Sequence, residues 1–108
     1  MQTVRDQSCE RGAIRGVIRA LKAAGFELFQ VHDGEEAVPV TTEAAAIEAA
    51  FAVDESRIRF RDAKGSTFSI YCVLGNADDG SEVIADHSDD SGPFAATIDA
   101  YCRGRGFY

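Results

Sequence analysis

Residues 57–74, RIRFRDAKGSTFSIYCVL, constrain the fold of this chain most, because two alternating polar and apolar runs flank a short loop. The loop, residues 63–65, suits a three-residue hairpin connection in which Gly65 takes the left-handed conformation of a G1 bulge. If Asp62 lies opposite Ser66, the facing pairs are Phe60–Phe68, Ile58–Ile70, Arg59–Ser69 and Arg57–Tyr71. The Phe and Ile side chains then share one face, and the other face carries Arg57, Arg59 and Arg61. A shift by one residue would mix the faces, so the pattern predicts this register.

The segment before the hairpin begins with a predicted amphipathic helix over residues 3–24. Its apolar stripe consists of Ile14, Val17, Ile18 and Leu21, and a neighbouring stripe is basic. Gly12 and Gly16 weaken this helix by about 1 kcal/mol each relative to alanine. Glycines four residues apart on a helix also allow, as an alternative role, the close approach of a second backbone. Gly25 suits the left-handed residue just past the helix, and Phe26 suits the next position, whose side chain folds back onto the last turn.

Residues 27–32 alternate as a strand would, which places Leu28 and Gln30 on one side and Phe29 and Val31 on the other. The Asp33-Gly34 pair predicts a tight turn. Pro39 in the return arm, residues 35–40, removes a backbone donor, so this arm is expected at the edge of the sheet.

A second helix is predicted over residues 42–53, capped by Thr41 or Thr42. We expect its apolar side to consist of Ala44, Ile47, Ala50 and Phe51. After residues 75–80, which are typical of a turn, residues 82–87 predict a third consecutive antiparallel strand. A last helix begins near Pro93 and ends at Arg103 and Gly104. Its apolar stripe consists of Phe94, Ile98, Tyr101 and Cys102.

This order, α-β-(β)-α-β-β-β-α without a βαβ repeat, predicts one α+β domain over residues 1–108. We expect an antiparallel meander of three to five strands with the helices packed on one face. A chain of 108 residues with 45% hydrophobic residues can bury a single core without metal or disulfide support. The first twelve residues are too polar for a signal peptide, and no apolar run approaches the length of a membrane span.

The cysteines indicate the cellular compartment. Cys9, Cys72 and Cys102 are odd in number and form no CxxC pair, and two of them fall on buried stripes. We therefore expect free thiols in a reducing cytoplasm.

Charge is distributed unevenly along the chain, whose net charge is −7. Residues 23–56 hold eight acidic residues and residues 65–102 hold seven, and neither segment contains Lys or Arg. Nucleic acid is therefore a poor partner, because phosphate neutralisation supplies most of that affinity, whereas a basic protein would be attracted.

The arginine-bearing side of the predicted sheet is unusually apolar for a solvated face. We expect an interaction face there, formed by Arg57, Arg59, Arg61, Tyr71, Val73 and Ile84. Ile84 belongs to it if Val83 and Ala85 point inward. A homodimer through this face or through the first helix is one interpretation. In the other, the arginines lie over the apolar side chains and pair with nearby acids.

Titratable groups cluster at two places, which are candidate sites for a divalent cation. One holds His32, Asp33 and Glu36, and the other holds Asp86 and His87. A shared cation would require the two segments to meet, and a hydrolytic site would then use the histidine nitrogens. Neither cluster has a recognised ligand spacing, and no nucleophile has a recognisable base. No cofactor is expected.

Several short segments resemble those of a family of small hypothetical proteins from phages and proteobacterial genomes. They are Val31–Glu36 (VHDGEE), Val53–Glu55 (VDE), Val73–Asn76 (VLGN) and Val83–Ser88 (VIADHS). His87 stands where the family pattern has an aromatic ring. The resemblance implies a mobile-element context and no mechanism.

The favoured hypothesis is a non-enzymatic acidic module for protein interaction or regulation, possessing no motif for catalysis. The alternative is a small metal-dependent enzyme or ligand binder that uses the two titratable clusters. A third hypothesis, an obligate homodimer, is compatible with the interaction-module hypothesis.

Overall fold

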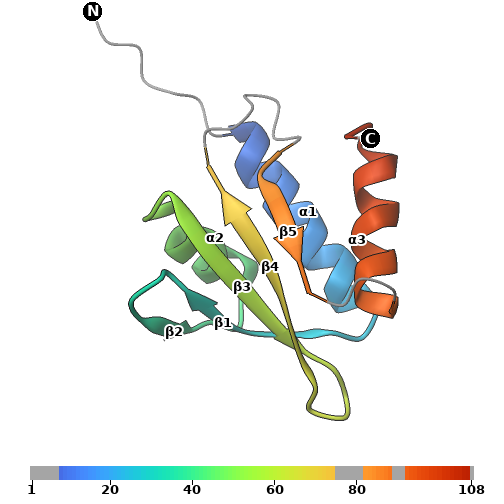
Figure 1. The fold of residues 1–108 in the computed structure, drawn as a ribbon, viewed down its shortest axis with the longest axis horizontal. Coiled ribbons are helices and arrows are strands. Elements are labelled where there is room, and N and C mark those ends of the chain that lie inside the picture. Colours follow the sequence, from blue (N-terminus) through green and yellow to red (C-terminus); the bar gives the residue numbers. More distant parts are fainter. Residues whose placement is uncertain (1–7, 75–81, 89–91, 108) are drawn as a thin grey trace, which may run out of the picture.

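The computed structural model describes residues 8–74, 82–88 and 92–107, and in these ranges three helices cover one face of a five-stranded antiparallel sheet (Figure 1). The elements are α1 (Ser8–Ala23), β1 (Glu27–His32), β2 (Ala37–Pro39), α2 (Glu43–Phe51), β3 (Glu55–Arg61), β4 (Thr67–Val73), β5 (Ile84–His87) and α3 (Pro93–Gly104). This arrangement confirms the predicted α+β class and element order. The part of the predicted first helix before residue 8 lies outside the described residues.

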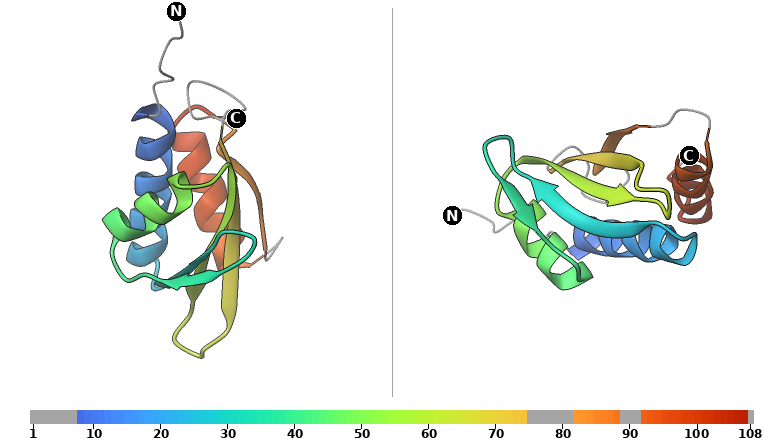
Figure 2. Two further views of the ribbon diagram at one scale, coloured as in Figure 1. Left: turned by 90° about the vertical axis from the view of Figure 1, so that its left-hand side faces the viewer. Right: turned by 90° about the horizontal axis from the view of Figure 1, so that it is seen from below.

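The strands lie in the order β2-β1-β3-β4-β5, so the predicted hairpin, β3 and β4, forms the middle of the sheet. Helix α2 connects the edge strand β2 to β3, and α1 and α3 pack against each other on the same side of the sheet (Figure 2). The opposite side, called here the outer face, is left uncovered by these helices. None of the helices in the described ranges is long and apolar enough to cross a bilayer.

The central hairpin has the predicted register. Ile58 pairs with Ile70, Phe60 with Phe68, Arg59 with Ser69 and Arg57 with Tyr71. The Asp62 amide donates to the Ser66 carbonyl at 3.0 Å, and Gly65 has φ 86°. Because a side chain at that φ would clash with the backbone, glycine is what allows the loop to close in three residues.

The core lies between the hairpin and the helices. Ile58, Phe60 and Ile70 from the sheet are fully buried against Phe94 of α3 and the apolar stripe of α1. The rings of Phe68 and Phe94 stack with centroids 5.0 Å apart. Each fully buried side chain of this size contributes about 1.5–3 kcal/mol of transfer free energy, so the hairpin and the helices stabilise one another.

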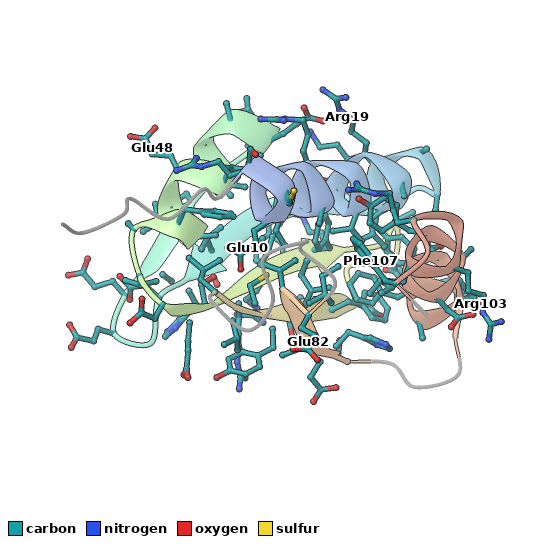
Figure 3. The ribbon with its side chains drawn as sticks, turned by 90° about the horizontal axis from the view of Figure 1, so that it is seen from above. Glu10, Arg19, Glu48, Glu82, Arg103 and Phe107 are labelled. Carbon is teal, nitrogen blue, oxygen red and sulfur yellow. The ribbon has the colours of Figure 1, made fainter. Side chains whose placement is uncertain are left out.

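Two helices end in the same backbone motif. After α1, the Phe26 amide donates to the Leu21 carbonyl at 3.0 Å, and Gly25 has φ 99°, as predicted. After α3, the Phe107 amide donates to the Cys102 carbonyl at 2.9 Å, and the left-handed residue is Gly106. Helix α3 ends at Gly104, as predicted, and the second glycine of the RGRG sequence, Gly106, supplies the left-handed residue of the cap. Phe107 packs against the core, toward which it points in Figure 3.

Strand β1 departs from the predicted alternation. Leu28 pairs with Phe60, but Gln30, not Phe29, pairs with Arg59, so Phe29 is an extra residue in a β-bulge. Leu28 and Val31 are therefore both buried, while Phe29 and Gln30 both contact arginines on the outer face. The prediction that Phe29 and Val31 share a side was wrong, because no residue type marks this bulge.

A second bulge changes the prediction for β5. Cys72 pairs with Ile84 and Tyr71 with Asp86, so Ala85 is the extra residue and is exposed. Ile84 packs against the core instead of joining the outer face. Its assignment to the interaction face was therefore wrong.

Helix α2 is shorter than predicted, and its contact side is shifted. Thr42 is the N-cap, its hydroxyl accepting from the Ala45 amide at 3.2 Å. The helix buries Ala46, Ile47 and Ala50, whereas Ala44 is exposed. An apolar surface made largely of alanines does not fix the angle at which a helix packs, and sequence spacing alone misplaced it.

Candidate functional site

The outer face is organised in rows that run across the strands. His32, Arg57, Tyr71 and Asp86 occupy one row, because each pairs with the next across β1, β3, β4 and β5. A second row holds Gln30, Arg59 and Ser69. Paired residues on neighbouring strands project to the same side of a sheet, so these two rows share the outer face.

Arg61, at one end of the face, is neutralised. Its guanidinium donates to Glu27 Oε1 at 2.9 Å, and both side chains are about half exposed. The Phe29 ring lies beneath it, 5.0 Å from the guanidinium carbon. This pair lowers the pKa of Glu27, chiefly through the side-chain hydrogen bond.

Arg59 and Arg57 have no such carboxylate partner among the described residues. Arg59 donates to Gln30 Oε1 at 3.1 Å and lies 5.5 Å from the Phe29 ring centroid. Arg57 lies 5.2 Å from the ring centroid of Tyr71. Stacking on an aromatic ring partly stabilises the positive charge of a guanidinium group. It does not use the N–H groups of the guanidinium as hydrogen-bond donors.

Tyr71 is fixed at the centre of the face. Its hydroxyl donates to Glu55 Oε2 at 2.7 Å, and this hydrogen bond is the main cause that raises the pKa of Tyr71. The bond orients the ring beneath Arg57 and occupies one oxygen of Glu55. Tyr71 therefore acts here as a rigid platform.

A hollow of the described surface lies over these rows. It has a volume of ≈ 540 Å³, within the range of small-ligand sites. It is lined by His32, Asp33, Gly34, Glu55, Ser56, Arg57, Arg59, Ser69 and Tyr71. A neighbouring hollow of ≈ 410 Å³ shares Arg57, Ser69 and Tyr71 with it and extends to Asp86, His87 and Ser88.

The acids that line the larger hollow are already hydrogen-bonded within the chain. Asp33 Oδ1 accepts from the amides of Glu35 and Glu36 at 2.8 and 2.7 Å, and these bonds lower the pKa of Asp33. Glu55 accepts from Tyr71. The hollow therefore offers unused donors, mainly on Arg57 and Arg59, while its acceptors are partly occupied.

The structure does not bring the two titratable clusters together. His32 and Asp86 stand in one row but are separated by β3 and β4, a span of about 14 Å at the usual strand spacing. Asp33 and Glu36 lie beyond His32 in the β1–β2 turn, and His87 lies on β5. No group of three or more His, Cys, Asp or Glu side chains in the described ranges could hold a metal ion. Within the described ranges, the order of the strands keeps the two clusters apart.

Several residues of the predicted interaction face lie on the same side of the sheet. Arg57, Arg59 and Tyr71 lie together on the outer face, with Arg61 at its end and Val73 in the adjoining row beside Glu55. Sequence reasoning missed Phe29 and Gln30, because the bulge that turns both outward leaves no pattern in the sequence. It also missed His32 as a neighbour of Arg57, because no pattern in the sequence indicates that β1 pairs with β3.

No family model, curated protein or solved structure matches this chain. The resemblance to small phage and proteobacterial proteins therefore stays a prediction.

Proposed function

We propose that this chain is a non-enzymatic protein-interaction module and that the outer face of its sheet is the contact surface. The observation that carries this proposal is a sheet covered by helices on one side only, with arginines stacked on aromatic rings on the other. Arg, Tyr and Phe are enriched at protein interfaces, where a few such residues supply most of the affinity.

The charge of the face selects the partner. Two arginines without a carboxylate partner among the described residues stand at its centre, in a protein whose net charge is −7. An acidic segment of a partner protein would supply the carboxylates that these two arginines lack, whereas the two arginines would repel a basic segment. We therefore propose a partner that presents Asp or Glu side chains to the outer face.

The partner expected from the net charge alone is basic, and it would have to use another surface. Asp33, Glu35 and Glu36 form an acidic turn between β1 and β2, beside the outer face. If the partner is acidic, substitution of the outer-face arginines should weaken binding. If the partner is basic, substitution of the acids in the β1–β2 turn should weaken it. A cytoplasmic setting and a role in regulation within a phage or another mobile element belong to the same proposal.

The test is binding of the purified protein to an array of peptides with the same apolar residues and either acidic, neutral or basic side chains. We expect selection of the acidic set, and we expect Arg57→Glu with Arg59→Glu to abolish or invert that selection. The matched control is Glu35→Gln with Glu36→Gln, which should leave it unchanged because neither residue lines the hollow. Selection of basic peptides that only the turn variant abolishes, or no selection at all, would overturn the proposal.

Sedimentation of the same variants decides whether a second copy occupies the face. We expect the wild-type protein to sediment as a monomer in the absence of peptide. A dimer that the Arg57→Glu and Arg59→Glu substitutions dissociate would replace the acidic partner with a homodimer.

A further inference from the structure

We propose that the hollow between Arg57 and Arg59 is a carboxylate-binding site, filled by one Asp or Glu side chain of the docking partner. This inference rests on the proposed function, since it names the group of the acidic segment that the outer face holds. The hollow lies in the middle of the face, with strands on both sides of it, so a chain passing over the sheet would reach it with a side chain.

The donors of the hollow match a carboxylate. The two guanidinium groups belong to the same side of β3, two residues apart, and line the same hollow. Arg59 is oriented by Gln30 and Arg57 by the Tyr71 ring, so both are positioned before any ligand arrives. Arginine binds carboxylates through paired N–H···O bonds, and such charge-assisted bonds are the strong ones in proteins.

The remaining residues that line the hollow favour a ligand with a single negative charge. The Ser69 amide already donates to the Ser88 hydroxyl, and the two arginines are the donors of the hollow that carry a full positive charge. The nearby ionised Asp33 would repel a second negative charge placed on its side. The geometry therefore fits a single carboxylate better than a polyanion.

Arg61 provides a matched control within the same strand. It lies on the same face as Arg57 and Arg59 and also stacks on an aromatic ring, but it is paired with Glu27 and does not line the hollow. A general effect of positive charge would involve all three arginines equally, whereas a site would involve only two.

The test is titration of the purified protein with N-acetylglutamate α-amide, followed through the backbone amide signals in NMR spectra. We expect saturable shifts at the amides of residues 57, 59, 69 and 71, and none with N-acetylglutamine α-amide, which has the same shape without the charge. Each substitution removes a hydrogen bond between a guanidinium group and the carboxylate of the probe. Arg57→Gln and Arg59→Gln should therefore each weaken binding about tenfold or more. Arg61→Gln should change it less than about twofold, because Arg61 is screened and outside the hollow.

Two outcomes would overturn the site. One is the absence of saturable shifts at these residues, and the other is an equal loss of binding in the Arg61→Gln variant. N-acetylalanine carries only an α-carboxylate, so it tests whether the bound carboxylate comes from a side chain or from the C-terminus of a chain. Tighter binding of N-acetylalanine than of the glutamate probe would assign the hollow to a C-terminus.

The failure of this inference can be separated from that of the proposed function. If the probe does not bind but acidic peptides still bind through the outer face, the face docks a partner without this anchor. If the probe binds but the peptide array shows no acidic selection, the hollow is a small-molecule carboxylate site and the docking proposal fails.

Discussion

Gly12 and Gly16 lie one turn apart on α1, but only Gly16 faces another side chain closely. A Cβ added to Gly16 would lie 2.6 Å from two ring carbons of Tyr101 on α3, whereas one added to Gly12 would meet nothing within 4 Å. The close contact at Gly16 thus involves an aromatic ring and not a second backbone. The Tyr101 hydroxyl accepts a hydrogen bond from the Arg105 guanidinium, and the same hydroxyl lies 3.5 Å from the Gly12 carbonyl oxygen.

We expect opposite effects from the same substitution at these positions. Gly16→Ala should lower the free energy of unfolding by about 1–3 kcal/mol, because the methyl group overpacks the contact with α3. Gly12→Ala should raise it by about 0.5–1 kcal/mol, because alanine restricts the unfolded chain and has the higher helix propensity. Urea denaturation measures both, and a stabilised Gly16→Ala variant would show that α3 does not pack here as described.

The three cysteines should react at different rates. Cys9 is exposed, whereas Cys72 and Cys102 are 2% and 4% exposed, and burial raises the pKa of the Cys72 thiol to about 12. Only the thiolate is nucleophilic, so one thiol should react promptly with a disulfide reagent in the native protein and all three after unfolding. Cys9→Ser should remove the prompt reaction, and prompt labelling of Cys72 would contradict the burial of β4.

At the scale of elements, the β3–β4 hairpin depends on the conformation of one loop residue. Gly65→Ala should destabilise the protein by about 1–2 kcal/mol, because an L-residue in the left-handed region brings its Cβ close to the carbonyl. Gly104→Ala is the control, since Gly104 is helical and a Cβ there meets no atom within 4 Å. Chemical denaturation compares the two, and equal stability of both variants would contradict the hairpin geometry.

Elements could be predicted from the sequence wherever a pattern had only one physical solution. The register of β3 and β4 was predictable because any shift would have mixed Phe60 with Thr67 across the pair. The bulges at Phe29 and Ala85 were not predictable, because an extra residue in a strand changes no local propensity and is decided by what the neighbouring strand presents. Glu10 lies on α1, is fully buried and points inward in Figure 3. Its burial was likewise not predictable from the sequence, because it follows only from how the helix packs against the sheet.

At the scale of the whole molecule, the outer face was predictable as an arginine-bearing surface but not as a hollowed one. The alternation on β3 places Arg57 and Arg59 together, and the sequence shows this directly. Among the described residues these two arginines have no carboxylate partner, and this depends on which strand lies beside β3 and on Glu27 reaching Arg61 instead. The separation of the two titratable clusters depended on strand order in the same way.

Ion pairs that join different elements predict how stability depends on pH. Arg19 donates to Glu43 at 2.7 Å, joining α1 to α2, and this hydrogen bond is the main cause that lowers the pKa of Glu43 from its ordinary 4.5. The pKa values of Glu27 and Asp33 are lowered as well. A carboxyl whose pKa is lower in the folded state stabilises the fold above its ordinary pKa, and this contribution is lost as the pH falls through the lowered value.

The free energy of unfolding should therefore decrease as the pH falls below about 4.5, and Glu43→Gln should make the decrease less steep. Glu48→Gln is the control, since Glu48 lies on the same helix and points into solvent (Figure 3). Denaturation over a series of pH values measures the slopes. A Glu43→Gln variant with the wild-type slope would show that the bridge between α1 and α2 does not form in solution.

The bulge in β1 has a consequence for the gene as well as for the protein. If the codon for Phe29 were lost, Leu28 and Gln30 would become neighbours and would still face Phe60 and Arg59, so the strand would close up without turning any core residue outward. Loss of the codon for Leu28 or Val31 would remove a buried residue outright. The middle of this strand is thus a place where an in-frame deletion would preserve the fold while stripping the ring from beneath two arginines, a route by which the binding surface could change in a single genetic event.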